Sequence, residues 1–318
     1  MDIDTSKFGH IGILMGGYSS EREISLKSGQ AVLEALKKTN CRVTPLDITM
    51  KDEREIEKFI KDSGIDVAFI ALHGKLGEDG VIQSILERLD IPYTGSGVEA
   101  SQRAINKIKT QLLLKENKIP VAPHVICSSK DTIDPKHLVK EIGLPLVVKP
   151  ASEGSSIGIT IVQTEKDIAP ALKIAFEYGD SVLIEGFIQG RELTVGILDN
   201  KFLPIIEIRP QAQFFDFKAK YKSGTTEYII PAQLPDAVAK SIGETALYAH
   251  QVLGCRDFSR IDVMLDKNNK PYILEINTIP GFTSVSLLPK AAKQAGLEFP
   301  QLCLKLIELA YEKKKQYK

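Results

Sequence analysis

The sequence predicts an α/β and α+β protein, with a Rossmann-like N-terminal domain followed by two further domains. Three observations support this class. The first hundred residues alternate short apolar runs with amphipathic helical stretches, and strand patterns dominate after Asp180. The length of 318 residues exceeds the roughly 100–200 residues of one domain. We therefore expect domains at residues 1–97, 98–182 and 183–318.

The composition narrows the classes of function. Lys and Arg number 41, and Asp and Glu number 41, so the formal net charge is zero. Such a chain has no overall positive field to attract a phosphate backbone or an anionic membrane. Its four cysteines are scattered without metal-ligand spacing, which is typical of reduced thiols. Residues 1–7 contain no apolar segment, and no run has the length of a membrane helix. We expect a cytoplasmic location, no nucleic-acid partner and no membrane partner.

The N-terminal domain is predicted to contain a parallel sheet. Strand candidates at 11–15 and 67–72 alternate along the chain with helical patterns at 21–38 and 81–89. Strands that alternate with helices form parallel sheets, and ligands bind beyond the carboxyl ends of those strands. The polar segments 16–20 and 73–74 lie at these ends.

The middle domain is predicted to carry a phosphate-binding turn. Its main elements are one helix and two strands, at 100–117, 146–149 and 159–162. Lys149 ends the first strand, and the small-residue turn 153–158 follows it. Backbone N–H groups of such a turn can surround phosphate oxygens while the lysine supplies charge. The segment is not a P-loop, because G-x-x-x-x-G-K-[ST] is absent. An ordinary β-hairpin is the alternative.

The third domain is predicted to be rich in strands. These fall at 181–185, 192–198, 202–208, 261–265 and 272–276, with a helix at 238–253 and one or two helices at the end of the chain. The last two strands flank a polar turn and predict an antiparallel hairpin. One face of this hairpin is expected to pack in the core, through Ile261, Val263, Leu265, Tyr272, Leu274 and Ile276.

The other face of the hairpin collects polar residues. A turn centred between residues 268 and 269 places Asp262 opposite Glu275 and Arg260 opposite Asn277. Opposed side chains lie about 5 Å apart, and like charges so placed repel, so the two carboxylates favour a cation between them. Carboxylate and amide oxygens are ligands of Mg²⁺. A solvent-facing surface neutralised by Arg260 is the alternative, and a β-bulge would spoil the register.

Three further polar segments are candidates for the site. Ser20 and Glu23 fit a capping box, which leaves the Glu21 carboxylate in the first helical turn to receive an ammonium group. His73 follows a buried strand, where it either braces the loop or contacts a ligand. Residues 277–286 form a Gly/Ser/Thr-rich loop, which is either a plain connector or a set of backbone donors for an oxyanion or carboxylate.

Together these segments resemble the D-alanine–D-alanine ligases, a family of the ATP-grasp superfamily. The matching stretches run in that family's order from about residue 13 to 296: MGGYSSEREISLKSG, HGKLGEDG, KPASEGSSIGI, LIEGFIQGRELTV, FKAKYKSGTTEY and RIDVMLDKNNKPYILEINTIPGFTSVSLLPKAAKQAG. The resemblance implies a two-domain ATP-grasp fold after the N-terminal domain. Lys75, Ile279 and Val285 depart from the usual pattern, but none of them removes a proposed ligand.

The resemblance also implies a role for each polar residue. ATP would be bound by Lys107, Lys149, Ser155, Ser156, Glu185, Ile188 and Glu192, with Glu185 and Ile188 at the adenine and Glu192 at the ribose. Two Mg²⁺ ions, for which Mn²⁺ can substitute, would be held by Asp262, Glu275 and Asn277. The first D-alanine would meet Glu21 and His73, and the second would meet Ser286 and Leu287. The catalytic groups would be Glu21, Ser155, Tyr221, Lys220, Arg260 and the Gly281 N–H.

The implied reaction joins two D-alanines for peptidoglycan precursor synthesis. ATP would convert the first carboxylate to an acyl phosphate, which the second amine then attacks. Tyr221 implies a dipeptide product, since relatives that use D-lactate carry Phe there. The resemblance implies a homodimer. The sequence leaves open whether D-alanine or D-serine is preferred as acceptor.

Three other classes of function fit these residues less well. Another ATP-grasp ligase would need neither Glu21 nor Ser286, and Tyr221 argues against a depsipeptide-forming variant. A non-catalytic nucleotide-binding regulator could lose the carboxylates and cations of the site, yet all are present. A dehydrogenase is excluded because the first glycine-rich segment lacks the G-x-G-x-x-G spacing.

Overall fold

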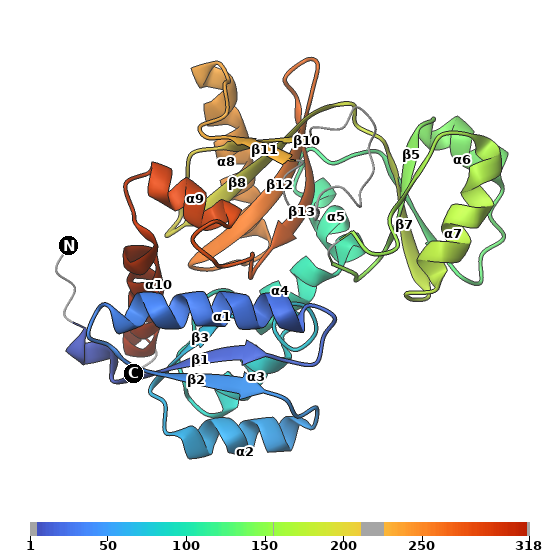
Figure 1. Cartoon of the computed structure of the whole chain (residues 1–318). Coiled ribbons are helices and arrows are strands. Elements are labelled where there is room, and N and C mark those ends of the chain that lie inside the picture. Colours follow the sequence, from blue (N-terminus) through green and yellow to red (C-terminus); the bar gives the residue numbers. More distant parts are fainter. Residues whose placement is uncertain (1–4, 155, 211–225, 317–318) are drawn as a thin grey trace.

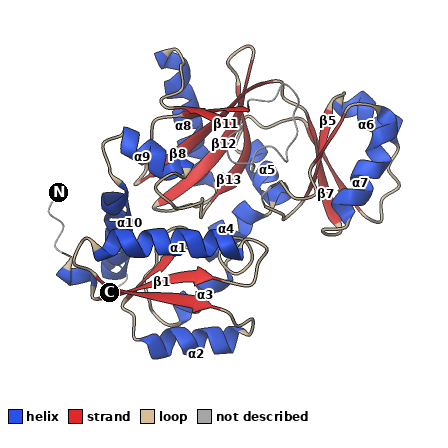
Figure 2. Cartoon of the chain, in the orientation of Figure 1, coloured by secondary structure: helices blue, strands red, loops and turns tan. Residues whose placement is uncertain are grey.

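The computed structural model describes residues 5–154, 156–210 and 226–316. Within that part of the chain there are three sheets, each accompanied by helices (Figures 1 and 2). The sheet of the middle unit stands apart from the other two, at the right of Figure 1. Among the described residues, no helix is both long and apolar enough to cross a membrane.

The N-terminal unit contains the predicted parallel sheet, in the order β2-β1-β3. Its elements are η1 (Ser6–Phe8), β1 (His10–Gly16), α1 (Arg22–Lys37), β2 (Arg42–Ile48), α2 (Glu53–Ser63), β3 (Val67–Ile70) and α3 (Val81–Arg88). The predicted strands and helices of this unit are confirmed. Strand β2 was missed because it is an edge strand that contains Pro45 and leaves several side chains exposed, so it has no apolar run.

The middle unit is an antiparallel sheet in the order β4-β7-β5-β6, with helices packed on it. Its elements are β4 (His124–Ser128), α6 (Pro135–Ile142), β5 (Leu146–Pro150), β6 (Thr160–Val162), η2 (Glu165–Asp167), α7 (Ile168–Phe176) and β7 (Ser181–Gly186). Strands β5 and β6 pair on either side of the predicted phosphate turn, so Lys149 lies near the end of its strand as expected.

The single helix predicted at 100–117 is wrong. The segment forms two helices, α4 (Val98–Ile105) and α5 (Lys107–Glu116), which meet at Asn106. Asn106 is extended (φ −94°, ψ 100°), and its side chain accepts a hydrogen bond from the Lys109 N–H at 3.0 Å. Because asparagine side chains compete with helical hydrogen bonds in this way, the residue starts a new helix. The break aims the first turn of α5 at the site described below.

The third unit is an antiparallel sheet in the order β11-β10-β8-β12-β13, with β9 beside β8. Its elements are β8 (Gly190–Leu198), β9 (Lys201–Phe202), β10 (Ile206–Pro210), β11 (Thr226–Ile229), α8 (Asp236–Val252), β12 (Phe258–Asp266), β13 (Pro271–Asn277), α9 (Leu287–Gln294) and α10 (Phe299–Gln316). The strand predicted at 202–208 is two strands, β9 and β10. Pro204 lies between them and has no N–H to donate to a ladder.

The hairpin β12–β13 has the predicted pairs, Asp262 opposite Glu275 and Arg260 opposite Asn277. The register shifts between Asp262 and Val263, however, and Val263 pairs with Ile273. Leu274 is therefore an extra residue, and Ile273 takes the core position. The prediction that Tyr272 and Leu274 face the core is wrong, whereas Ile261, Val263, Leu265 and Ile276 do lie there. The turn is also one residue shorter than predicted, since Leu265 pairs with Pro271. The shorter turn and the extra residue shift the register in opposite directions, so Asp262 still lies opposite Glu275.

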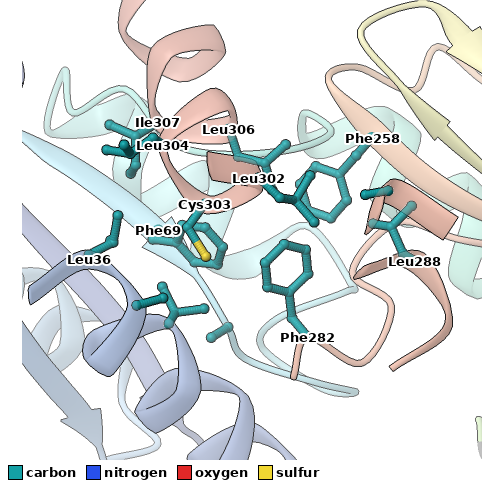
Figure 3. Close-up of a cluster of buried hydrophobic side chains, with 14 of the residues drawn as sticks. Leu36, Phe69, Phe258, Phe282, Leu288, Leu302, Cys303, Leu304, Leu306 and Ile307 are labelled. Atoms are coloured by element: carbon teal, nitrogen blue, oxygen red, sulfur yellow. The ribbon is translucent and has the colours of Figure 1, made fainter. Parts of the chain in front are cut away.

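One hydrophobic cluster joins the N-terminal sheet to the end of the chain (Figure 3). Phe282, from the loop after β13, packs on Phe69 of β3 with ring centroids 5.3 Å apart and on Phe258 of β12 at 5.9 Å. Leu302 and Leu306 of α10 lie in the same cluster. The C-terminal helix therefore completes the core of the N-terminal sheet. This packing also fixes the loop after β13 beside the carboxyl ends of β1 and β3.

Candidate active site

Two adjoining cavities contain most of the predicted site residues. The first, of about 260 Å³, lies between the middle and third units, and the second, of about 480 Å³, lies between the N-terminal loops and the loop after β13. Lys107, Arg260 and Glu275 line both. Predicted residues in the first also include Lys149, Ser156, Glu185, Ile188, Glu192, Asp262 and Leu287. Those in the second also include Glu21, His73, Asn277 and Gly281. Predicted residues Ser155, Lys220 and Tyr221 lie outside the described residues.

Asp262 is surrounded by hydrogen-bond donors. Arg260 donates from Nε to Oδ1 at 3.0 Å and from Nη2 to Oδ2 at 2.8 Å. Thr194 of β8 donates to Oδ1 at 2.6 Å, and the Asn277 amide nitrogen lies 3.4 Å from Oδ2. Arg260 thus neutralises Asp262, as one alternative expected. Glu275 pairs with a different cation, since the Lys107 Nζ lies 3.4 Å from its Oε2.

The hairpin face has donor atoms suited to a hard cation. No group of three or more His, Cys, Asp or Glu side chains in the described part of the chain is arranged to hold a metal ion. Asp262 and Glu275 are opposed carboxylates, and Asn277 adds an amide oxygen. Mg²⁺ commonly takes one or two carboxylates and completes its shell with water and substrate phosphates. The residues present therefore fit Mg²⁺ better than an ion that needs a complete protein cage.

Lys149 and Glu185 form a buried ion pair in the first cavity, between neighbouring strands β5 and β7. Glu185 is only 2% exposed, and its Oε1 has no hydrogen-bond partner among the described residues. A buried oxygen without a donor is costly in a folded protein. Because Glu185 lines the cavity, a ligand that carries an N–H donor would satisfy this oxygen. An aminated heterocycle such as adenine has that donor.

Lys107 joins the turn at 153–158 to β13, through Glu153 and Glu275. Its Nζ donates to the Glu153 carbonyl oxygen at 2.7 Å, and its backbone N–H donates to the Ala151 carbonyl oxygen at 2.7 Å. In the turn itself, Ser156 and Gly158 have positive φ values of 59° and 70°. A Cβ at position 158 would lie 2.7 Å from the Pro150 side chain, so this position requires glycine.

The capping box predicted from Ser20 and Glu23 is wrong. Helix α1 begins at Arg22 with Glu21 as its N-cap residue, and no side chain caps it. The Glu21 N–H donates to Ser19 Oγ at 3.2 Å instead. The Glu21 carboxylate is closely packed, because a Cβ at Gly74 would lie 2.7 Å from its Oε2 and one at Gly154 would lie 3.5 Å away. Glu21 therefore lies where the N-terminal and middle units meet.

His73 braces the loop after β13, as one of its two readings expected. Its Nδ1 lies 3.0 Å from the Ile279 carbonyl oxygen, which can only accept, so Nδ1 carries the proton in the neutral ring. Its Nε2 lies 3.0 Å from Ser28 Oγ, which also accepts from the Phe282 N–H at 3.2 Å. Sequence analysis missed Ser28 because a buried serine inside a helical pattern carries no local signal.

The loop after β13 ends at the N-terminus of α9. Ser286 is the N-cap residue, its Oγ accepts from the Thr283 N–H at 3.1 Å, and it lies 3.5 Å from the Cβ position of Gly281. Leu287 is the first helical residue and lines the first cavity, whereas Ser286 lines neither cavity. The segment brings backbone donors of the loop and of a helix N-terminus to one side of the site.

An N-terminal parallel sheet, followed by two α+β units that enclose a cavity lined by lysines and carboxylates, defines the class of ATP-grasp ligases. Models of the families described as D-ala D-ala ligase N-terminus and D-ala D-ala ligase C-terminus match residues 10–55 and 50–96, and residues 113–308. The chain belongs to the D-alanine–D-alanine ligase family.

Curated relatives and solved structures agree with this placement. D-alanine–D-alanine ligases from Pelotomaculum thermopropionicum and Desulforudis audaxviator are each 45% identical over 95% of this chain, covering 96% and 99% of the relatives. A D-alanine–D-alanine ligase structure from Bacillus anthracis superposes with a TM-score of 0.88 at 36% identity, covering 98% of this chain and all of the other. A Bacillus anthracis D-alanine–D-alanine ligase structure complexed with ATP gives a TM-score of 0.86 at 34% identity, and it also covers 98% of this chain and all of the other.

Proposed function

We propose that this chain joins two D-alanines into D-alanyl-D-alanine through an acyl phosphate, with ATP converted to ADP and phosphate. The observation that carries the proposal is that Lys107, Arg260 and Glu275 line both cavities. A phosphate that enters from the first cavity and a carboxylate that enters from the second would meet at this cluster. Holding two reactants in contact is the main requirement of such a transfer.

The first cavity is proposed to bind ATP. Lys107 and Lys149 would hold phosphate oxygens, and the turn that contains Ser155 and Ser156 would cover them. The adenine amino group would donate to the unsatisfied Glu185 Oε1, beside the backbone of Ile188, and Glu192 would meet the ribose. Asp262, Glu275 and Asn277 would hold two Mg²⁺ ions, or Mn²⁺ in their place. When bound, these ions supply positive charge to the phosphate oxygens.

The second cavity is proposed to bind the first D-alanine, and the start of α9, where Leu287 lines the first cavity, is proposed to bind the second. The Glu21 carboxylate would accept the ammonium of the first D-alanine, and His73 would lie near its carboxylate. Ser286 and the Leu287 N–H at the start of α9 would bind the carboxylate of the second D-alanine. The α9 dipole favours a negative charge at that place.

Two transfers follow from this placement. A carboxylate oxygen of the first D-alanine bonds to the γ-phosphorus, and the bond from that phosphorus to the bridging oxygen breaks to release ADP. The amine of the second D-alanine then bonds to the activated carbonyl carbon, loses a proton and expels phosphate. Arg260 and the Gly281 N–H would stabilise the negative oxygen that forms in this second step.

Several assignments rest on the family pattern. Lys220 would reach the transferred phosphate, and Tyr221 would join Glu21 and Ser155 in closing the site and would favour an amine acceptor over D-lactate. We also propose a cytoplasmic homodimer that serves peptidoglycan precursor synthesis. Of the predicted domains 1–97, 98–182 and 183–318, the second extends through β7, because this strand pairs within the middle sheet.

The test is ADP release from Mg-ATP with D-alanine, with L-alanine as the parallel control and the product identified by mass. The expected result is release with D-alanine only, together with the dipeptide. If neither isomer supports release while ATP still binds, the proposal fails. The chain would then join another carboxylate to another amine.

A further inference from the structure

A buried glutamine on α5 bonds to the backbone of β13, the strand that carries Glu275. Gln111 is fully buried, and its Nε2 donates to the carbonyl oxygens of Leu274 at 2.9 Å and of Ile273 at 3.3 Å. Carbonyl oxygens only accept, so the amide nitrogen must be the atom that faces them. Gln111 lies one helical turn after Lys107, which contacts Glu275.

These two carbonyls belong to the bulge in β13. In a regular strand successive carbonyls point to opposite edges, so one amide nitrogen could not reach both of them. The extra residue Leu274 disrupts the ladder and turns the backbone. The N–H of Ile273 donates to the Pro120 carbonyl oxygen at 3.0 Å, outside the sheet. Because β13 is an edge strand, α5 and the segment after it hold the bulge from its open side.

The bulge decides which residue faces Asp262. The pairs from the turn to Val263–Ile273 share one register. If that register continued unchanged, Leu274 would lie opposite Asp262. The extra residue moves Glu275 into that place. Leu274 and Glu275 then both line the first cavity, and the two carboxylates oppose each other.

Gln111 contributes these hydrogen bonds at a cost to the fold. Its Oε1 is buried and has no hydrogen-bond partner among the described residues. An unsatisfied buried oxygen is destabilising, and an apolar side chain of the same size would avoid it. The geometry therefore indicates that the amide serves the bulge.

We propose that Gln111 is a positioning residue for the reaction: it holds the β13 bulge so that the Glu275 carboxylate lies opposite Asp262 for Mg²⁺. The inference rests on the proposed role of Glu275 as a metal ligand. Residues that orient metal ligands typically change metal affinity or activity by 10–100-fold when they are replaced.

The test compares variants of the full-length chain by the Mg²⁺ concentration that gives half-maximal ADP release at saturating ATP and D-alanine. Gln111→Met keeps the size of the side chain and removes the donor. Gln111→Glu keeps its shape but places a carboxylate against two carbonyls. Thr110→Val is the matched control, because Thr110 is buried on the same helix and its hydroxyl donates to the Arg103 carbonyl at 2.9 Å, away from β13.

We expect the Mg²⁺ requirement to rise about tenfold or more in both Gln111 variants, with the KM for D-alanine unchanged and Thr110→Val like the parent. An unchanged Mg²⁺ requirement in both variants would overturn the inference. Loss of ATP binding or of the folded state in both would assign Gln111 to the fold and would also overturn it. Glu275→Gln, assayed in parallel, separates the two proposals. If it does not change the Mg²⁺ requirement, the metal role of Glu275 fails, whatever Gln111 does.

Discussion

Arg260 and Asp262 lie two residues apart on one strand and are joined by a two-point hydrogen bond, Nε to Oδ1 at 3.0 Å and Nη2 to Oδ2 at 2.8 Å. This fork fixes the planes of both side chains, and Thr194 holds Asp262 from the neighbouring strand. Since Arg260 lines both cavities, the proposed reaction would bring the phosphate and the carboxylate that attacks it to this guanidinium.

Arg260→Lys is expected to lower kcat by roughly 100-fold, because one ammonium cannot keep the fork and still meet a developing oxyanion. Steady-state ADP release measures this. The matched control is Arg191→Lys, which removes a similar fork to Glu207 (3.0 and 2.7 Å) away from both cavities. The control should lose stability and keep kcat. Equal losses of kcat in both variants would contradict the role of Arg260.

Glu185→Gln is expected to change the choice of nucleotide. The unsatisfied Oε1 offers an acceptor only, which suits the amino group of adenine and repels the carbonyl that guanine presents there. A glutamine amide offers a donor as well. We expect the preference for ATP over GTP, measured as the ratio of kcat/KM values, to fall by roughly tenfold, about the value of one hydrogen bond. An unchanged ratio would place the base elsewhere.

Ser28→Ala is expected to loosen the loop after β13. The change leaves the Phe282 N–H without its acceptor and the His73 Nε2 without its partner, at a cost of about 1–3 kcal/mol in the free energy of unfolding. The KM for D-alanine should rise more than the KM for ATP. Ser25→Ala is the control, since the Ser25 hydroxyl is also buried on α1 but bonds to Ala71 and Gly16. If both variants change both KM values alike, Ser28 has no special link to this loop.

Acid is expected to destabilise the fold through His250. Burial lowers the pKa of this histidine from 6.5 to about 4, and its Nδ1 lies 2.7 Å from Ser259 Oγ. Between these two pKa values the unfolded chain binds a proton that the folded chain does not, so stability falls as the pH falls below 6.5. The loss from pH 7 to pH 5 should be about 2 kcal/mol. Urea unfolding at pH 7 and pH 5 measures this drop in the free energy of unfolding, which should be smaller in His250→Gln than in the parent by about that amount. A drop as large as the parent's would exclude His250 as the cause.

The sequence could predict the parts of this structure that have local patterns. Alternating strands and helices predicted the parallel sheet, and the polar turn at 266–270 predicted the hairpin and its carboxylate pair. The bulge at Leu274 was not predictable, because any apolar residue can occupy such a position. Thr194, Gln111 and Ser28 were missed for another reason. Each acts through hydrogen bonds to residues far away in sequence, and such bonds leave no periodic signal.

The cluster in Figure 3 has a consequence for synthesis of the chain. The side of the first sheet that carries Phe69 is covered by Leu302 and Leu306, which are translated more than two hundred residues later. When the first unit leaves the ribosome, only α1 is available to cover that side, and the apolar part that α10 later covers stays exposed. Surfaces of this kind recruit chaperones or aggregate. We expect the N-terminal unit to reach its final form only after α10 has been synthesised, although domains made first usually fold first.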